Sequence, residues 1–178
     1  MPNKQIVYID SCGFIDAVKQ TVGVLPTGRD DDVWHIKKLM EAHRAGDILV
    51  VTSFLTLAEC VAIESGQSIV PPDIQEQFRL LLSSGRYVAL LQQTPQTARI
   101  AQDLRWQHHL VIAGADALHF AAAIEAHAIE FITSDERLKK PKVAAAVPAL
   151  GALGLRLING AATTCLPTSY LQGELPGA

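Results

Sequence analysis

The chain has 178 residues, which is enough for one domain with a buried core. Its residues are 49% hydrophobic and 19% charged, and this balance excludes an intrinsically disordered protein. The formal net charge of -3 gives no overall attraction to nucleic acid, although a local basic face can coexist with an acidic site that binds cations.

The cysteines and the hydrophobic runs indicate the cellular compartment of the protein. Cys12, Cys60 and Cys165 are far apart and odd in number, which argues against a disulfide framework or a zinc knuckle. No hydrophobic run approaches the ~20 residues that a membrane-spanning helix needs. The N-terminal sequence MPNKQIVYID does not resemble a secretory leader. We therefore expect a cytoplasmic protein without a membrane partner.

Five short hydrophobic runs predict the strands of a sheet. Their hydrophobicity is nearly continuous and does not alternate, which is typical of strands covered on both faces. The predicted strands are Ile6–Ile9, Ile48–Thr52, Tyr87–Leu91, Glu130–Thr133 and Leu155–Ile158.

Segments of helical length lie between these runs. Asp30–Ala45 begins with aspartates and is followed by Gly46, which are helix start and stop signals. Ser53 is expected to cap a helix that runs through Ser65. The other predicted helices are Pro71–Ser84, Pro95–His109, Ala115–His127 and Asp135–Ala146. This alternation predicts a three-layer α/β/α sandwich around a central, mostly parallel five-stranded sheet.

The periodicity is lost after Asn159, where glycine and proline become frequent. We expect residues 1–160 to form a single domain and residues 161–178 to be a partly irregular C-terminal tail on its surface.

Four acidic residues lie where a predicted strand gives way to a helix, or inside the helix that follows: Asp10, Glu59, Asp116 and Asp135. In a parallel sheet the strand ends of one polarity line one edge, so residues far apart in sequence can meet there. Carboxylates that meet repel one another, and a hard divalent cation is the usual remedy. The pattern predicts a magnesium or manganese site, and therefore chemistry on phosphate.

Each acidic residue has a local reason to be at such a site. Asp10 follows the strand IVYI, and Ser11 could cap the next helix while lending a hydroxyl group. Glu59 is predicted about two turns into its helix, from where a long side chain can reach back over the sheet edge. Asp116 begins GADALHF, at a helix start that favours an anion.

Asp135 ends FITSD, and the hydroxyl groups of Thr133 and Ser134 lie beside it. Taken singly, each aspartate could be an ordinary helix cap. Glu59 is harder to explain in this way, because an unpaired carboxylate inside the hydrophobic segment TLAECVAIE would be costly. Metal-assisted hydrolysis of a phosphodiester needs no nucleophilic side chain, and the sequence contains no GxSxG motif and no P-loop.

IVYIDSCGFID, TLAECVA, GADALHFAAA and FITSDERL resemble, in this order, the four conserved stretches of PIN domains, most closely those of VapC-type toxin ribonucleases. The resemblance implies a Mg²⁺- or Mn²⁺-dependent endoribonuclease that cleaves RNA, is restrained by a cognate antitoxin and is often a homodimer. The family's acidic quartet carries over onto Asp10, Glu59, Asp116 and Asp135 as catalytic and metal-binding residues. Asp10 and Asp116 correspond to the surest ligands, and Ser11, Thr133 and Ser134 are candidates for substrate contacts.

Other polar residues are given less specific roles. We expect His119 to pack beside the site, because hard cations prefer oxygen ligands. Asp16 is interpreted as a solvated residue, and Arg29 as part of a mixed-charge helix start. Arg137 follows Asp135 closely enough to hold a phosphate backbone. Further candidates for an RNA-facing surface are Arg79, Arg86, Arg99, Arg105, Lys139 and Lys140.

Three alternatives remain open at this stage. PIN domains also serve in RNA processing without a toxin role, and a PIN fold without activity could be a binding module. A phosphatase of the haloacid dehalogenase type also places an aspartate after its first strand. It requires a second aspartate two residues later, however, where this chain has Cys12.

Overall fold

The computed structural model describes residues 4–112, 114–135 and 147–172. Its five strands form one sheet in the order β3-β2-β1-β4-β5, with β1 at the centre. Every pairing in this sheet is parallel. The strands are β1 (Ile6–Ile9), β2 (Leu49–Ser53), β3 (Ala89–Leu91), β4 (Glu130–Ile132) and β5 (Arg156–Ile158). The predicted five-stranded sheet is confirmed.

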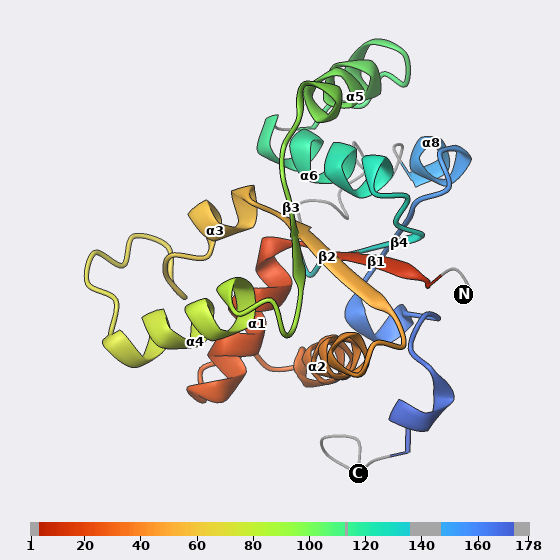
Figure 1. The fold of residues 1–178 in the computed structure, drawn as a ribbon. Coiled ribbons are helices and arrows are strands. Elements are labelled where there is room, and N and C mark those ends of the chain that lie inside the picture. Colours follow the sequence, from red (N-terminus) through yellow and green to blue (C-terminus); the bar gives the residue numbers. More distant parts are fainter. Residues whose placement is uncertain (1–3, 113, 136–146, 173–178) are drawn as a thin grey trace.

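Helices cover both faces of the sheet, so the three-layer α/β/α prediction is also confirmed (Figure 1). One layer contains α1 (Ser11–Thr21), α2 (Asp30–Ala45) and α4 (Pro72–Ser83). The opposite layer contains α5 (Pro95–Trp106), α6 (Gly114–Glu125) and α8 (Val147–Ala152). A short helix, α3 (Leu55–Glu59), follows β2. Among the described helices, none is long and apolar enough to cross a bilayer.

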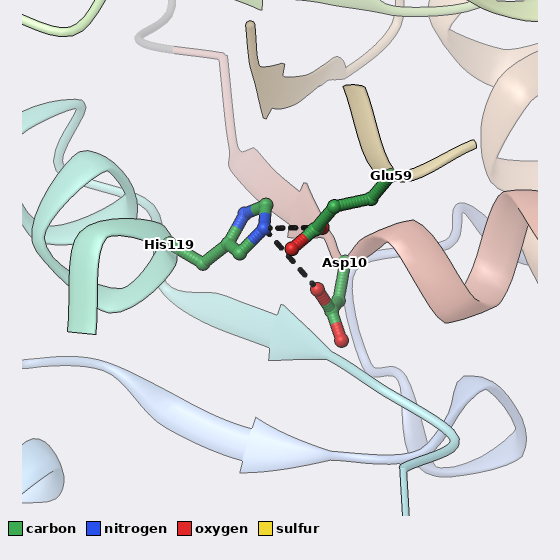
Figure 2. A group of neighbouring side chains, drawn as sticks. All are labelled: Asp10, Glu59 and His119. Carbon is green, nitrogen blue, oxygen red and sulfur yellow. Dashed lines mark hydrogen bonds and ion pairs between the residues drawn. The ribbon is translucent and has the colours of Figure 1, made fainter. Parts of the chain in front are cut away.

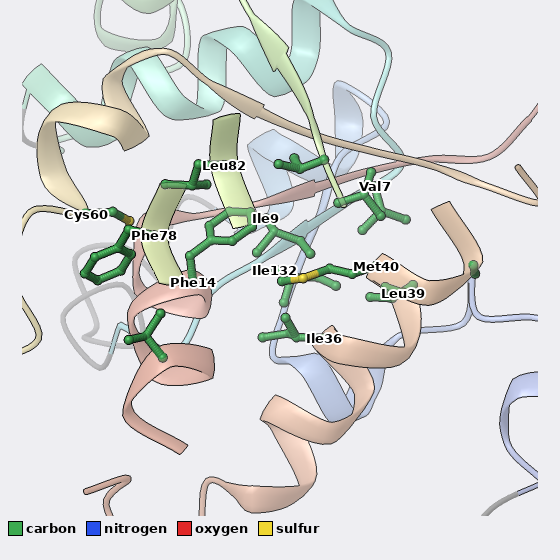
Figure 3. Close-up of a cluster of buried hydrophobic side chains, with 14 of the residues drawn as sticks. Val7, Ile9, Phe14, Ile36, Leu39, Met40, Cys60, Phe78, Leu82 and Ile132 are labelled. Carbon is green, nitrogen blue, oxygen red and sulfur yellow. The ribbon is translucent and has the colours of Figure 1, made fainter. Parts of the chain in front are cut away.

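Alternate side chains of β1 enter two separate cores. Val7 and Ile9 pack with α1, α2 and α4, as Figure 3 shows for Phe14 and Ile36. Tyr8 points to the other face, against Phe131 and the helices α5 and α6. Full burial of a large hydrophobic side chain contributes about 1.5–3 kcal/mol. Burial on both faces therefore explains why the strands read as continuous hydrophobic runs.

Helix α2 has the predicted bounds, and Gly46 follows it with a φ of 87°, the left-handed conformation that glycine tolerates best. The prediction of a helix from Ser53 to Ser65 was wrong, because α3 ends at Glu59. Cys60 leaves the helical region, with φ -82° and ψ 57°. Cys60 and Ile63 turn inward to the core of α1 and α4, and this packing prevails over the local helical pattern.

Two further differences concern whole helices. The helix α8 was not predicted from the sequence. The predicted helix Asp135–Ala146 lies, apart from Asp135, outside the described residues. Each strand begins and ends within two residues of its predicted bounds. The predicted sheet edge is therefore retained.

The segment after β5 is anchored to the sheet and to α2. A Cβ atom on Gly160 would lie 2.3 Å from the carbonyl oxygen of Asp32, so only glycine fits this approach. The Ala161 N–H donates to Asp32 Oδ1 at 2.8 Å. Farther along, Cys165 and Leu166 are buried in the core that α1 and α2 share. This part of the tail therefore contributes to the core beside α2.

Candidate metal centre

Asp10 occupies the junction between β1 and α1. Its N–H donates to Ile132 O at 3.0 Å, which continues the pairing of β1 with β4, and the residue is only 8% exposed. Its Oδ1 accepts from the Ser11 N–H at 2.8 Å, so Asp10 caps α1. The expectation that Ser11 is the cap was wrong: Ser11 is the first residue of the helix, and its Oγ lies 3.4 Å from Asp10 Oδ1.

Three side chains from separate elements meet at this junction (Figure 2). Asp10 comes from the end of β1, Glu59 from the last residue of α3 and His119 from α6. His119 Nε2 lies 2.8 Å from Glu59 Oε2 and 3.9 Å from Asp10 Oδ1. One ligand atom from each residue lies within 4.8 Å of the other two. Residues separated by more than a hundred positions thus form one compact group.

The carboxylates around His119 create a negative electrostatic potential at its ring. Burial on its own would lower the pKa of His119, but the hydrogen bond with Glu59 and the charges of Asp10, Glu59 and Asp116 outweigh it. The pKa is therefore raised above its ordinary value, because the carboxylates favour a positive charge. On the other side of the ring, Nδ1 lies 2.6 Å from the Tyr8 hydroxyl. The expectation that His119 packs beside the acidic residues is confirmed.

The donor set fits a divalent cation. Carboxylate oxygens suit Mg²⁺ and Mn²⁺, and an imidazole nitrogen is a borderline ligand that Mn²⁺ accepts more readily. Neighbouring ligands of an octahedral ion with bonds of ~2.1 Å are about 3 Å apart. Asp10 and Glu59 each offer an oxygen within 4.8 Å of the other, which is close enough for one ion to bind both while His119 holds Glu59 by its 2.8 Å contact.

The other two acidic residues of the predicted quartet approach the same region. Asp116 is in the first turn of α6, and its charge helps to raise the pKa of His119 one turn later. Asp135 follows β4 and lines the same cleft as Glu59. The structure thus places Asp10 and Glu59 in the compact group, with Asp116 and Asp135 on its margins.

Thr133 links Asp10 to Asp135 by hydrogen bonds. Thr133 is buried, and its Oγ1 donates to Asp10 Oδ2 at 2.9 Å while accepting from the Asp135 N–H at 3.1 Å. Cys12 Sγ also donates to Asp10 Oδ2, at 3.1 Å, and accepts from the Ser134 N–H at 3.2 Å. The hydroxyl of Thr133 therefore orients the carboxylate of Asp10 from inside the protein.

A cleft of about 630 Å³ opens beside the acidic group. Its volume is in the range of pockets that hold small ligands. Glu59, Ser134 and Asp135 line it near the acidic group, and the loop after α3 forms another wall. Lys19 and Arg29 also line this cleft. A negatively charged strand that enters the cleft would meet both the acidic group and two basic side chains.

Asp16 corrects the sequence analysis. It was expected to be solvated, but it is only 3% exposed and its Oδ2 accepts from Ser134 Oγ at 2.7 Å and from Arg29 Nη1 at 2.8 Å. The buried side chains of Phe14 and Ala17 flank it on α1. A carboxylate on the hydrophobic face of a helix was the sequence signal for its burial.

The predicted RNA-facing residues are distributed differently from Lys19 and Arg29. Arg79 lines a separate cavity of about 570 Å³ beside α4, and Arg105 lines one of about 330 Å³ at α5. Arg137, Lys139 and Lys140 lie outside the described residues. Among the residues that the structure describes, the arginine that lines the cleft beside the acidic group is Arg29. The sequence analysis had interpreted Arg29 as part of a helix start.

Comparison with known families identifies the fold. Residues 7–144 match the PIN domain family. The chain belongs to the PIN domain family. This match covers most of the chain and includes all four members of the acidic quartet, so the family suggested by the sequence motifs is confirmed.

A solved structure has a similar fold. The protein resembles a chain of VapBC2 from Rickettsia felis, whose crystal structure contains a DNA fragment from its promoter, with a TM-score of 0.54 and 18% sequence identity. The similarity covers 86% of this chain and 97% of that chain. No functionally curated protein matches the sequence significantly. At this identity the likeness establishes a shared fold.

Proposed function

We propose that this PIN domain is a Mg²⁺- or Mn²⁺-dependent endoribonuclease that hydrolyses RNA phosphodiester bonds. The observation that carries the proposal is the meeting of Asp10 and Glu59 at His119, with donor atoms within 4.8 Å, beside a cleft that Asp135 also lines. Such a concentration of carboxylates favours a bound cation. PIN family membership supports the nuclease assignment over an unrelated metal site.

In this proposal Asp10, Glu59, Asp116 and Asp135 hold the cation. A bound divalent cation stabilises negative charge on phosphate oxygens and lowers the pKa of a bound water. The protein orients Asp10 through the Ser11 N–H, Cys12 and Thr133, so this carboxylate needs little rearrangement to act as a ligand. His119 fixes Glu59 by the 2.8 Å hydrogen bond.

Substrate contacts are proposed on the same edge. Ser11, Thr133, Ser134 and Arg137 remain the candidates that the motifs suggested. The hydroxyls of Thr133 and Ser134 already bond to Asp10 and Asp16, and this favours a role in orienting these carboxylates. The open cleft is suited to single-stranded or looped RNA, whose backbone can follow a groove.

We further propose that the protein is the toxin of a type II toxin–antitoxin pair, acting in the cytoplasm and restrained by a cognate antitoxin. The fold similarity to a chain of VapBC2, which extends over 97% of that chain, supports this role over a nuclease of RNA processing. A homodimer is also proposed, on the grounds of family resemblance. Induced expression of the native chain should arrest growth, whereas Asp116→Asn should not; equal arrest by both would contradict a toxic nuclease activity.

The decisive experiment is cleavage of a mixed RNA pool with Mg²⁺, with Mn²⁺ or with EDTA. We expect cleavage by the native protein with either cation, no cleavage with EDTA, and none by Asp10→Ala. Asp103→Asn, an exposed position on α5, is the matched control and should cleave normally. Cleavage that survives both chelation and Asp10→Ala would exclude the proposed mechanism.

A further inference from the structure

The cleft beside the acidic group carries charges of both signs. Lys19 on α1 and Arg29 immediately before α2 line it together with Asp16, Glu59, Glu64 and Asp135. The carboxylates outnumber the basic groups, so an anion would be repelled unless a cation were bound at the acidic end. With such a cation in place, the cleft would offer positive charge at the metal and again at Lys19 and Arg29.

Arg29 is held in a defined position. Its Nη1 donates to Asp16 Oδ2 at 2.8 Å, and the same oxygen accepts from Ser134 Oγ at 2.7 Å. The Asp16 side chain is 4% exposed, whereas the Arg29 side chain is 29% exposed. The carboxylate thus binds the guanidinium from the buried side. The guanidinium keeps its positive charge in this ion pair, so Arg29 presents a positive charge to the cleft that it lines.

The same segment links Arg29 to the acidic group. Ser134, which shares Asp16 Oδ2 with Arg29, lies between Thr133, which bonds to Asp10, and Asp135, which lines the cleft. All three residues directly follow β4 in the central sheet. The segment that follows β4 therefore fixes the distance between the Arg29 guanidinium and the acidic group. One ligand can contact both at a constant spacing.

We propose that Arg29, oriented by Asp16, and Lys19 bind a backbone phosphate of the RNA strand near the phosphate that is cleaved. The inference rests on the proposed nuclease function, which supplies the strand and the cation. Arginine binds phosphate through paired, charge-assisted hydrogen bonds, and lysine contributes a point charge. An RNA strand carries a charge at every nucleotide, so it can engage the metal end and the basic end of the cleft together.

Binding of a fluorescently labelled, mixed-sequence single-stranded RNA tests the proposal. All variants keep the four acidic residues, and anisotropy is measured with Mn²⁺ at several salt concentrations, with a gel after each titration to check that the RNA is intact. Arg29→Gln should weaken binding about tenfold and reduce the slope of log K against log [salt] by about 0.7, the effect of one lost phosphate contact on a single strand. Lys19→Gln should do the same, whereas Arg29→Lys should keep the slope with weaker binding.

Arg79→Gln is the matched control, because Arg79 is exposed and lines the separate cavity beside α4. Thermal unfolding of each variant shows whether the loss of the Asp16 contact affects folding, and Arg29→Lys covers the case in which Arg29→Gln does not fold. Equal RNA affinity and salt slope for the Arg29, Lys19 and Arg79 variants would overturn the proposal. So would a loss of binding to the cognate antitoxin without a loss of RNA binding, because the basic pair would then serve a protein partner.

These outcomes are separable from failure of the nuclease itself. RNA cleavage by the native chain, with Arg29→Gln as competent in binding as Arg79→Gln, would reject the phosphate site and leave the nuclease in place. Absence of both Mn²⁺ binding and cleavage in the native chain would instead reject the proposed function, and with it the inference that depends on it.

Discussion

Glu59 Oε2 and His119 Nε2 are 2.8 Å apart, although 60 residues separate them in the sequence. The other ring nitrogen of His119 lies 2.6 Å from the Tyr8 hydroxyl, which in turn accepts from the Ser53 N–H at 3.0 Å. The imidazole is therefore held at both nitrogens by groups on the sheet and on α3. Its position directs the Glu59 carboxylate toward Asp10 and gives the cluster its shape.

Replacing His119 should loosen this arrangement. In His119→Ala the Tyr8 hydroxyl and the Glu59 carboxylate lose their shared partner, and we expect a loss of about 1–3 kcal/mol in the free energy of unfolding. Mn²⁺ affinity, measured by calorimetry, should fall about 10–100-fold, as for other residues that orient metal ligands. His119→Gln should recover part of both losses through its amide N–H. His127→Gln, at an exposed position just after the same helix, is the control, and an equal effect there would refute the role of the His119 ring.

Thr133 provides a second test of orientation. Thr133→Val keeps the shape of the side chain but removes the hydrogen bonds to Asp10 Oδ2 and from the Asp135 N–H. We expect about 1–2 kcal/mol of destabilisation and an approximately tenfold or larger fall in Mn²⁺ affinity. Thr133→Ser retains the hydroxyl and should bind Mn²⁺ as the native protein does. If serine is as impaired as valine, packing of the methyl group and not the hydroxyl bond explains the result.

Cation binding should be visible as stabilisation of the fold. Mn²⁺ at 100 times its dissociation constant should add about 2.7 kcal/mol to the free energy of unfolding, because only the folded state assembles the ligands. The midpoint of thermal unfolding should therefore rise with Mn²⁺ in the native protein and return on addition of EDTA. Asp10→Asn should abolish the rise, and Asp103→Asn should preserve it. A rise of the same size in Asp10→Asn would place the cation elsewhere.

Glu130 predicts a specific dependence of stability on pH. It is fully buried in β4 and accepts from Thr163 Oγ1 at 2.6 Å and from the Thr164 N–H at 2.9 Å, and it pairs with Arg156. Burial on its own would raise the pKa of Glu130, but the hydrogen bonds from Thr163 and Thr164 outweigh it and lower the pKa below its ordinary value. This carboxylate therefore attaches the segment after β5 to the sheet.

A carboxyl group whose pKa is lowered by folding stabilises the protein fully above its unfolded pKa, and this stabilisation is lost as pH falls through the folded-state pKa. Glu130→Gln should consequently cost about 2 kcal/mol at pH 7, and the difference from the native protein should shrink below about pH 4. Denaturant titrations at both pH values measure this. Glu76→Gln, at an exposed position on α4, should show little effect. A deficit that is constant with pH would mean that the charge of Glu130 does not contribute.

His127 offers a stabilising substitution. It follows α6 with a φ of 56°, a left-handed conformation that costs a residue with a Cβ atom about 1 kcal/mol relative to glycine. His127→Gly should therefore raise the free energy of unfolding by about 0.5–1 kcal/mol. Ala98→Gly, at an exposed position within α5, should lower the free energy of unfolding by a similar amount, because glycine is less favourable than alanine inside a helix. Destabilisation by both substitutions would show that the His127 ring makes a compensating contribution.

Much of the fold could be predicted because its signals are local. The run Ile6–Ile9 has the bounds of β1, and the aspartates in the first turn of α2 with Gly46 after it mark a helix whose ends are as predicted. Asp10 and Asp135 follow strands by their position in the chain alone. In a parallel sheet this places both at one edge, so their neighbourhood follows from topology.

The parts that could not be predicted depend on partners distant in sequence. The end of α3 at Glu59 is decided by the inward packing of Cys60 and Ile63, and the burial of Asp16 by Ser134 and Arg29. No window of neighbouring residues contains these contacts.

The amino-acid sequence therefore determined the alternation of strands and helices and the edge at which the acidic residues gather, because periodicity, caps and strand ends are properties of short segments. Only the tertiary structure decided that His119 bonds to Glu59, and that Arg29 lines the cleft beside them. These hydrogen bonds and this burial depend on how the separate layers of the fold pack. The contacts form only when the layers are packed together.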